Sequence, residues 1–273
     1  MVSFKLFKVG YCRQCEKIAR KSGDMKVTEF PMIVGLVEFG DEKVLFDTGY
    51  SRHFKDCTGP LPEKLYDLLI PVTLDDDGDI ANILLKNGID PYSITKVVLS
   101  HFHADHISGV RLFDHAQVIC SKAGMEDFYS RGRIASIREG YLHGLLPKNF
   151  KDKAHFFEDL ESVKETLLAG FDNAYWLNKE NGIAIVELPG HKTGHFGLYI
   201  KPLNTLFAAD VCWRRETYTD LQLPSIIGLA VQEDKQAYVE TIRLVHKLHH
   251  EQGVKIILCH CLDSYQEYLD EKA

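Results

Sequence analysis

Three histidines and one aspartate lie close together in the segment LSHFHADHISG, residues 99–109. They are His101, His103, Asp105 and His106, and they form the pattern HxHxDH. Imidazole nitrogens and carboxylate oxygens are ligands of zinc and other divalent ions in proteins. The apolar run ITKVVLS comes directly before them and is typical of a buried strand. We therefore expect a metal-binding loop at the exit of a strand.

Four side chains are too few to hold two metal ions, so further ligands must lie downstream. Three candidates follow apolar runs: His191 after GIAIVEL, Asp210 at the end of TLFAAD and His260 at the end of KIILCH. Such positions lie where strands end and a sheet edge opens, as at the ligand sites of α/β sheets. We expect these residues to complete the site.

The elements that must position these residues form two groups along the chain. Strands and closing helices alternate in each group, which favours an α/β fold with two β-sheets packed face to face and helices outside. The expected strands are 3–9, 31–40, 43–49, 94–100 and 117–121 in the first group, and 182–190, 195–202, 205–210 and 255–260 in the second. The expected helices cover about 79–87 and 236–253.

We expect one domain, residues 1–273, with a helical insertion at about 122–150. This insertion carries scattered aromatic residues, among them Phe128 and Tyr141. If it covers the site, these side chains would line an apolar substrate pocket. The alternatives are that they pack the insertion onto the sheets or form a dimer contact.

The composition limits the partners that the protein can have. Hydrophobic residues make up 45% of the 273 residues, enough for a substantial core. A net charge of −7 argues against general affinity for nucleic acid or an anionic membrane. The N-terminus lacks an apolar signal segment and no run is long enough to span a membrane, so we expect a cytoplasmic protein.

Cys12 and Cys15 form a CxxC pair without a second such pair along the chain. A zinc knuckle needs two pairs, and a thioredoxin-like site needs a βαβ setting that the flanking residues do not offer. We interpret these cysteines as two unrelated thiols near the surface.

The chain resembles the metallo-β-lactamase superfamily, whose pattern is HxHxDH followed by a distant histidine, an aspartate and a histidine. The resemblance runs from FDTG at 46–49 to His260. It implies an αββα sandwich of two mixed sheets flanked by helices. It also implies that Asp47 braces the histidine loop.

The resemblance implies a binuclear centre. The first metal ion would be held by His101, His103 and His191, and the second by Asp105, His106 and His260, with Asp210 between them. Two divalent ions that share a water lower its pKa toward 7, and the bridging hydroxide is then the nucleophile of a hydrolysis. Asp105 would move the proton. Zinc is the expected metal, although manganese or iron suits the same ligands.

Within the superfamily, the layout is most similar to the acyl-homoserine lactonases, so a lactone or other small ester is the expected substrate. Those lactonases place a tyrosine three residues after the bridging aspartate, where this chain has Trp213. Tyr218 lies nearby in sequence and is the candidate to replace that tyrosine, although the spacing alone does not show this.

Three alternatives stay open: a thioester hydrolase of the glyoxalase II type, a persulfide dioxygenase with a single iron, and a non-catalytic protein stabilised by metal. A secreted β-lactamase is disfavoured because the chain lacks an export signal, and an RNA-processing nuclease because it lacks a basic surface. We expect a small-molecule substrate and a monomer or homodimer.

Overall fold

The computed structural model describes residues 1–76 and 78–271. It is a mixed α/β structure with two mixed sheets and helices, so the predicted fold class is confirmed. The strands are β1 (Ser3–Cys15), β2 (Val27–Phe39), β3 (Glu42–Phe46), β4 (Val72–Thr73), β5 (Lys96–Val98), β6 (Gln117–Cys120), β7 (Ala154–Phe156), β8 (Ala174–Asn178), β9 (Ile183–Glu187), β10 (Phe196–Ile200), β11 (Thr205–Phe207) and β12 (Lys255–Ile257). The α-helices are α1 (Glu16–Ala19), α2 (Arg52–Thr58), α3 (Lys64–Leu69), α4 (Ile80–Lys86), α5 (Ala104–Ile107), α6 (Lys122–Ser130), α7 (Arg133–Arg138), α8 (Phe150–Lys153), α9 (Arg215–Thr219), α10 (Ile226–Ala230), α11 (Lys235–Gln252) and α12 (Leu262–Asp270).

The chain divides into two compact units. The N-terminal unit comprises Met1–Arg13 and Pro31–Phe156, and the C-terminal unit comprises Gln14–Phe30 and Phe157–Ala273. The expectation of one domain with an insertion at 122–150 stays a prediction.

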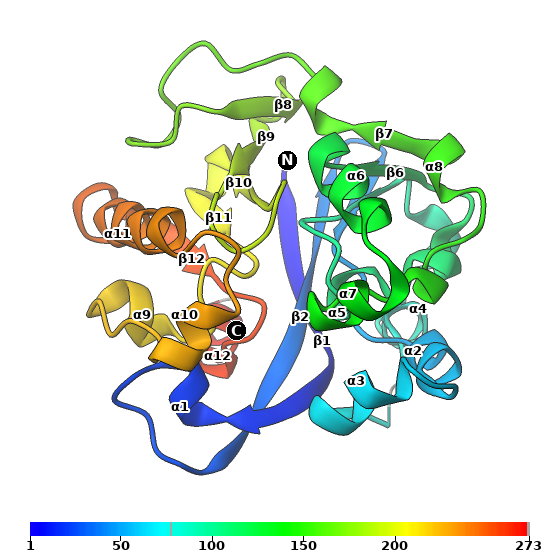
Figure 1. Ribbon diagram of the computed structural model, residues 1–273. Helices are drawn as coiled ribbons and strands as arrows, with labels where there is room; N and C mark the ends of the chain where they lie inside the picture. Colours follow the sequence, from blue (N-terminus) through cyan, green and yellow to red (C-terminus); the bar gives the residue numbers. More distant parts are fainter. Residues whose placement is uncertain (77, 272–273) are drawn as a thin grey trace. The chain divides into compact units, whose positions relative to one another are not determined.

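The seven-stranded sheet has the strand order β4-β1-β2-β3-β5-β6-β7 (Figure 1). Its centre is parallel, since β5 pairs with β3 on one side and β6 on the other. Val97 and Val98 of β5 are fully buried, as expected for a parallel strand covered on both faces. The chain leaves β5 through residues 99–103 and enters α5, so this strand positions the histidine loop.

The five-stranded sheet of the C-terminal unit has the order β12-β11-β10-β9-β8 (Figure 1). Helix α11 packs on it through Tyr238, Ile242, Val245 and Leu248, whose helical spacing had indicated one buried face. The helix begins where the Asp234 side chain accepts hydrogen bonds from two backbone N–H groups, and it ends at Gly253 with φ +62°.

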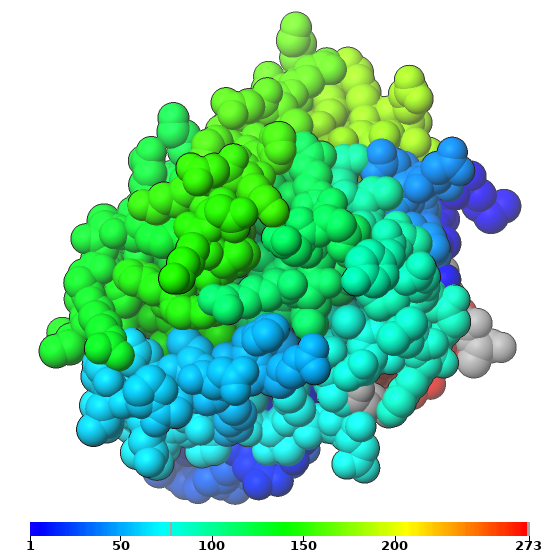
Figure 2. All heavy atoms as spheres, turned by 90° about the vertical axis from the view of Figure 1, so that its right-hand side faces the viewer, coloured from blue at the N-terminus to red at the C-terminus, as the bar shows by residue number. Residues whose placement is uncertain are grey.

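The segment 122–150 is helical, as expected, and consists of α6, α7 and the turn that leads to α8. Arg111 anchors it by donating hydrogen bonds to the carbonyl oxygens of Gly144, Leu145 and Leu146 at 2.7–3.0 Å. Figure 2 shows its green surface beside the blue-cyan surface of α2 and α3. Arg133 and Glu63 join the two regions through an ion pair of 2.6 Å.

Two sequence expectations differ from the structure. The strand expected at 3–9 continues to Cys15, and this puts Cys12 on the buried face of β1, so its placement near the surface was wrong. Three strands were not foreseen. β4 and β7 have two and three residues, which carry too little periodicity, and β8 has five residues and lies at the edge of its sheet. Among the described residues, we find no helix of the length and apolarity that crossing a membrane requires.

Candidate metal centre

The histidine loop begins where β5 ends, and a buried aspartate of the neighbouring strand supports it. Asp47 follows β3, which pairs with β5, and its backbone has a φ of +61°. A non-glycine residue in this left-handed region is strained and is found mostly at functional sites. The backbone N–H of Asp47 donates to Val98 O at 2.8 Å, so the turn is tied to the strand that carries the loop.

The Asp47 carboxylate accepts three hydrogen bonds and is fully buried. Ser100 donates to it from its backbone N–H and from its hydroxyl group, both at 2.8 Å. His106 Nδ1 lies 2.7 Å from Asp47 Oδ2. Because a carboxylate only accepts, His106 must carry its proton on Nδ1, and this leaves the Nε2 lone pair for a metal ion. The role of Asp47 as the residue that braces the histidine loop stays a prediction.

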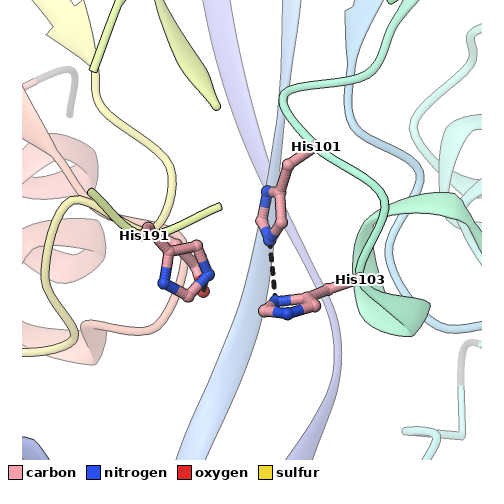
Figure 3. Close-up of side chains that lie close together, drawn as sticks. His101, His103 and His191 are labelled. Atoms are coloured by element: carbon pink, nitrogen blue, oxygen red, sulfur yellow. Dashed lines mark hydrogen bonds and ion pairs between the residues drawn. The ribbon is translucent and has the colours of Figure 1, made fainter. Parts of the chain in front are cut away.

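The first two histidines of the loop point at each other. His101 Nε2 lies 2.9 Å from His103 Nδ1, as the dashed line in Figure 3 marks. Gly140 makes room for the His103 ring, since a Cβ atom at Gly140 would lie 2.8 Å from His103 Cδ2. Asp105 Oδ2 lies 3.7 Å from His106 Nε2. The four loop residues predicted as ligands therefore form one cluster in the N-terminal unit.

The C-terminal unit brings its three predicted ligands together around one carboxylate. Asp210 Oδ2 lies 3.3 Å from His191 Nε2, and Asp210 Oδ1 lies 3.3 Å from His260 Nε2. All three side chains are buried. They come from different places: the turn after β9, the residues after β11 and the residues after β12. A carboxylate with one oxygen toward each of two imidazoles is suited to bridge two ions.

A thiol joins this C-terminal group. Cys259 donates a hydrogen bond to Asp210 Oδ1, and the ligand atoms of Asp210, Cys259 and His260 lie within 4.8 Å of one another. The sequence analysis missed Cys259, although its place directly before His260 was a usable signal. A thiolate would add a soft ligand that zinc accepts.

Asp210 is also fixed through its backbone. His195 Nδ1 donates to Leu188 O at 2.8 Å, so its Nε2 is free of a proton and accepts the Asp210 N–H at 3.2 Å. Ala209, directly before Asp210, has a φ of +45°. Asp210 therefore lies at the end of a strained turn, as Asp47 does in the other unit.

Two residues predicted to contact substrate lie near Asp210 in sequence but differ in setting. The indole Nε1–H of Trp213 donates to Asp210 Oδ2 at 3.2 Å, and the ring lies edge-on to His191 with 6.3 Å between centroids. Tyr218 is buried in the core of the unit, where its hydroxyl group lies 3.5 Å from Ile256 O. The structure thus brings Trp213, and not Tyr218, to the Asp210 carboxylate.

The other two residues of the expected substrate pocket pack inside the N-terminal unit. Phe128 and Tyr141 are almost fully buried, with ring centroids 5.2 Å apart. The Tyr141 hydroxyl group donates to Asp127 at 2.9 Å, and its ring lies 6.0 Å from the His103 ring. Their role in a substrate pocket stays a prediction.

Burial keeps two tyrosine phenols and one cysteine thiol in their protonated, neutral forms. Desolvation is the largest cause that raises the pKa of the Tyr238 phenol and of the Cys212 thiol well above their usual ranges. Desolvation, followed by the charge of Asp105, likewise raises the pKa of Tyr50. These groups are therefore neutral at physiological pH and are poor candidates for anionic metal ligands.

The donor set of each unit fits a divalent metal ion. In the N-terminal unit, two imidazole nitrogens converge and His106 is held with Nε2 available. In the C-terminal unit, a buried carboxylate faces two imidazole nitrogens. Buried carboxylates and imidazoles in contact are costly unless they are paired or bind a metal, and this chemistry favours metal ligands.

A family model and several proteins of known function resemble the chain. The model of the metallo-beta-lactamase superfamily matches residues 33–251. The N-acyl homoserine lactonase AttM of Azorhizobium caulinodans is 24% identical over 213 residues, which cover 74% of this chain and 71% of that protein. The N-acyl homoserine lactonase AiiA of Bacillus thuringiensis subsp. kurstaki is 23% identical over 198 residues, which cover 71% of this chain and 69% of that protein.

A solved structure supports the fold. An N-acyl homoserine lactone hydrolase with N-hexanoyl-L-homoserine bound at its catalytic metal center has a TM-score of 0.74. It is 18% identical, and the comparison covers 97% of this chain and 95% of that chain. At this identity the likeness concerns the fold alone. The assignment to the superfamily rests on the family model.

Proposed function

The chain belongs to the metallo-β-lactamase superfamily and is a metal-dependent hydrolase, and we propose that it opens a small ester by means of a binuclear metal centre. The observation that carries this proposal is the set of ligands in each unit: HxHxDH around Asp47 in one, and His191 and His260 around Asp210 in the other. Each set is incomplete for two ions, and together they supply seven ligands.

We propose that seven residues hold two divalent ions. His101, His103 and His191 would hold one ion, Asp105, His106 and His260 the other, and Asp210 would bind both. Zinc is the proposed metal, because imidazole and carboxylate ligands suit it and Cys259 stands beside them. Manganese and iron would suit the same nitrogen and oxygen atoms.

Two such ions would supply a water of lowered pKa and a Lewis acid for the carbonyl oxygen. The chain's own residues supply positions and a proton carrier. Asp105 is the residue proposed to take the proton of the attacking water through its carboxylate oxygen and to pass it to the leaving oxygen. Asp47 and Ser100 keep His106 in one tautomer, so that its Nε2 lone pair points away from them.

A lactone is the favoured substrate because the relatives AttM and AiiA are N-acyl homoserine lactonases. A thioester or another open ester is the second candidate, because Trp213 departs from the lactonase pattern. Its only side-chain donor, the indole N–H, already donates to Asp210, so Trp213 lacks a donor for a substrate carbonyl. The resemblance had placed a tyrosine with a hydroxyl group there.

Proton release in a pH-stat tests the proposal, because lactone opening forms a carboxylic acid. We would compare an acyl-homoserine lactone with an acyl thioester, using zinc-loaded protein and a chelator-treated control. Fast acid release from the lactone that the chelator abolishes is the expected result. Release from the thioester alone would move the substrate assignment, and no release from either would contradict ester hydrolysis.

The remaining expectations about the protein's setting are also proposals. We propose a cytoplasmic protein that acts as a monomer or homodimer. Cell fractionation and sedimentation of the purified chain test the two statements separately.

A further inference from the structure

We propose that Gln232 is the positioning residue of His191 and that it sets the tautomer in which this histidine binds metal. The side chain of Gln232 is buried, and its Oε1 lies 2.7 Å from His191 Nδ1. The inference rests on the proposed function, because it concerns how one of its ligands is presented.

The orientation of the Gln232 amide follows from its second partner. Gln232 Nε2 donates to Gly228 O at 2.9 Å. A carbonyl oxygen only accepts, so the NH₂ group must face Gly228 and the amide oxygen must face His191. His191 therefore carries its proton on Nδ1, and its Nε2, which lies 3.3 Å from Asp210, presents a lone pair.

The position of Gly228 is fixed by close packing. A Cβ atom at Gly228 would lie 2.0 Å from Ile18 O, so only glycine allows α10 to approach α1 this closely. The Ser225 hydroxyl group caps α10 by accepting the Gly228 N–H at 3.3 Å. The carbonyl group that orients Gln232 thus belongs to a helix whose place is fixed by close packing and by a capping hydrogen bond.

The backbone around His191 is held by other bonds. Glu233 N–H donates to His191 O at 3.2 Å, and Asp234 N–H donates to Gly190 O at 3.0 Å. Glu233 also accepts the Thr193 N–H at 2.8 Å. Because these bonds do not involve the Gln232 side chain, changing that side chain should alter the imidazole and leave the loop in place.

The test compares Gln232→Leu and Gln232→Glu with the wild type and with Gln236→Leu. Leucine removes the acceptor that faces His191. Glutamate keeps an acceptor toward His191 and has a similar shape, but it loses the donor to Gly228 O. Gln236 is an exposed glutamine four residues on and serves as the matched control. The readout is zinc affinity, measured by competition with a chromophoric chelator. Thermal unfolding of the metal-free proteins serves as the check on folding.

We expect Gln232→Leu to weaken zinc binding about 10–100-fold, the usual cost of losing an outer partner of a ligating histidine. Gln232→Glu keeps an acceptor toward His191 and loses the bond to Gly228 O, so it should lose clearly less affinity than Gln232→Leu, and Gln236→Leu should match the wild type. In the wild type, NMR should show a slowly exchanging imidazole Nδ1 proton that is missing in Gln232→Leu.

Two results would overturn the inference while the proposed function stands. In the first, the wild type binds two zinc ions and the Gln232→Leu variant binds them with the same affinity. The other is an equal loss of affinity in Gln232→Leu and Gln232→Glu, which would mean that only the neutral glutamine packs correctly. A wild type that binds no metal would instead overturn the proposed function.

Discussion

The two units present their candidate ligands in opposite ways. In the N-terminal unit, four candidate ligands lie within one short loop, and the buried carboxylate of Asp47 accepts hydrogen bonds from it. In the C-terminal unit, three candidate ligands come from three separate strand ends, and the neutral amide of Gln232 faces His191. A charged acceptor makes an imidazole more electron-rich than a neutral one does. The comparison teaches that the two halves of one proposed centre depend on different outer partners.

The largest expected effect comes from Asp210→Asn in the C-terminal unit. The change removes the negative charge that faces His191 and His260, so both proposed ions lose a ligand. We expect zinc affinity and hydrolysis to fall by more than the roughly 100-fold upper cost of losing an outer partner. Zinc content after dialysis and the rate of acid release measure this. Asp220→Asn, at an exposed position of the same unit, is the control, and equal behaviour of the two variants would contradict the role of Asp210.

Asp47→Asn tests the charged brace of the N-terminal unit. In either orientation the NH₂ group of asparagine faces a donor: the Ser100 N–H at the position of Oδ1, or the Ser100 hydroxyl group and His106 Nδ1 at the position of Oδ2. We expect zinc affinity to fall about 10–100-fold and unfolding free energy to fall by about 1–3 kcal/mol. Chelator competition and denaturant titration check the two effects.

The exposed Asp41→Asn is the control for the Asp47 variant. If the charge of the brace matters, Asp47→Asn will cost more affinity than Gln232→Leu does. A larger loss of zinc affinity in Gln232→Leu than in Asp47→Asn would contradict the idea that a charged partner contributes more than a neutral one.

Ser100→Ala sharpens the same comparison at smaller scale. The serine hydroxyl group donates to Asp47 and lies 3.0 Å from His101 Nδ1, so its loss leaves Asp47 with one donor fewer. We expect a destabilisation of about 1 kcal/mol, seen as a lower denaturation midpoint. Ser130→Ala, on the exposed end of α6, should leave the midpoint unchanged. A Ser100 variant as stable as that control would show that the hydroxyl group contributes nothing to the loop.

Trp213→Phe should have a smaller effect on hydrolysis than Asp210→Asn does. It removes the indole N–H that donates to Asp210 and keeps an aromatic ring beside His191. Loss of one hydrogen bond to a carboxylate, about 1.5 kcal/mol, corresponds to a change of about tenfold in kcat/KM. Steady-state kinetics with lactone and thioester measure it, with Trp176→Phe as control. A gain on lactone in Trp213→Tyr would indicate that the indole is what disfavours lactones.

The sequence predicted the fold, and it located the candidate ligands where local patterns carry information. HxHxDH after an apolar run located the loop, and the 3.6-residue period of α11 identified its buried face. Gln232 could not be found in this way, because its contact with His191 spans 41 positions and depends on helix α10, whose Gly228 accepts a hydrogen bond from the Gln232 amide. The orientation of Trp213 was equally out of reach, since sequence does not say which acceptor an indole N–H will find.

The most direct test of the account is a zinc titration of metal-free protein in the presence of lactone. Zinc is added in measured equivalents per chain, and the rate of acid release is recorded after each addition. The account predicts that the rate rises until two equivalents of zinc are bound. It also predicts that the maximal rate of His260→Ala is only a small fraction of the maximal rate of the wild type. A rate that is already maximal at one equivalent, or that is unchanged in His260→Ala, would contradict a centre built from the ligands of both units.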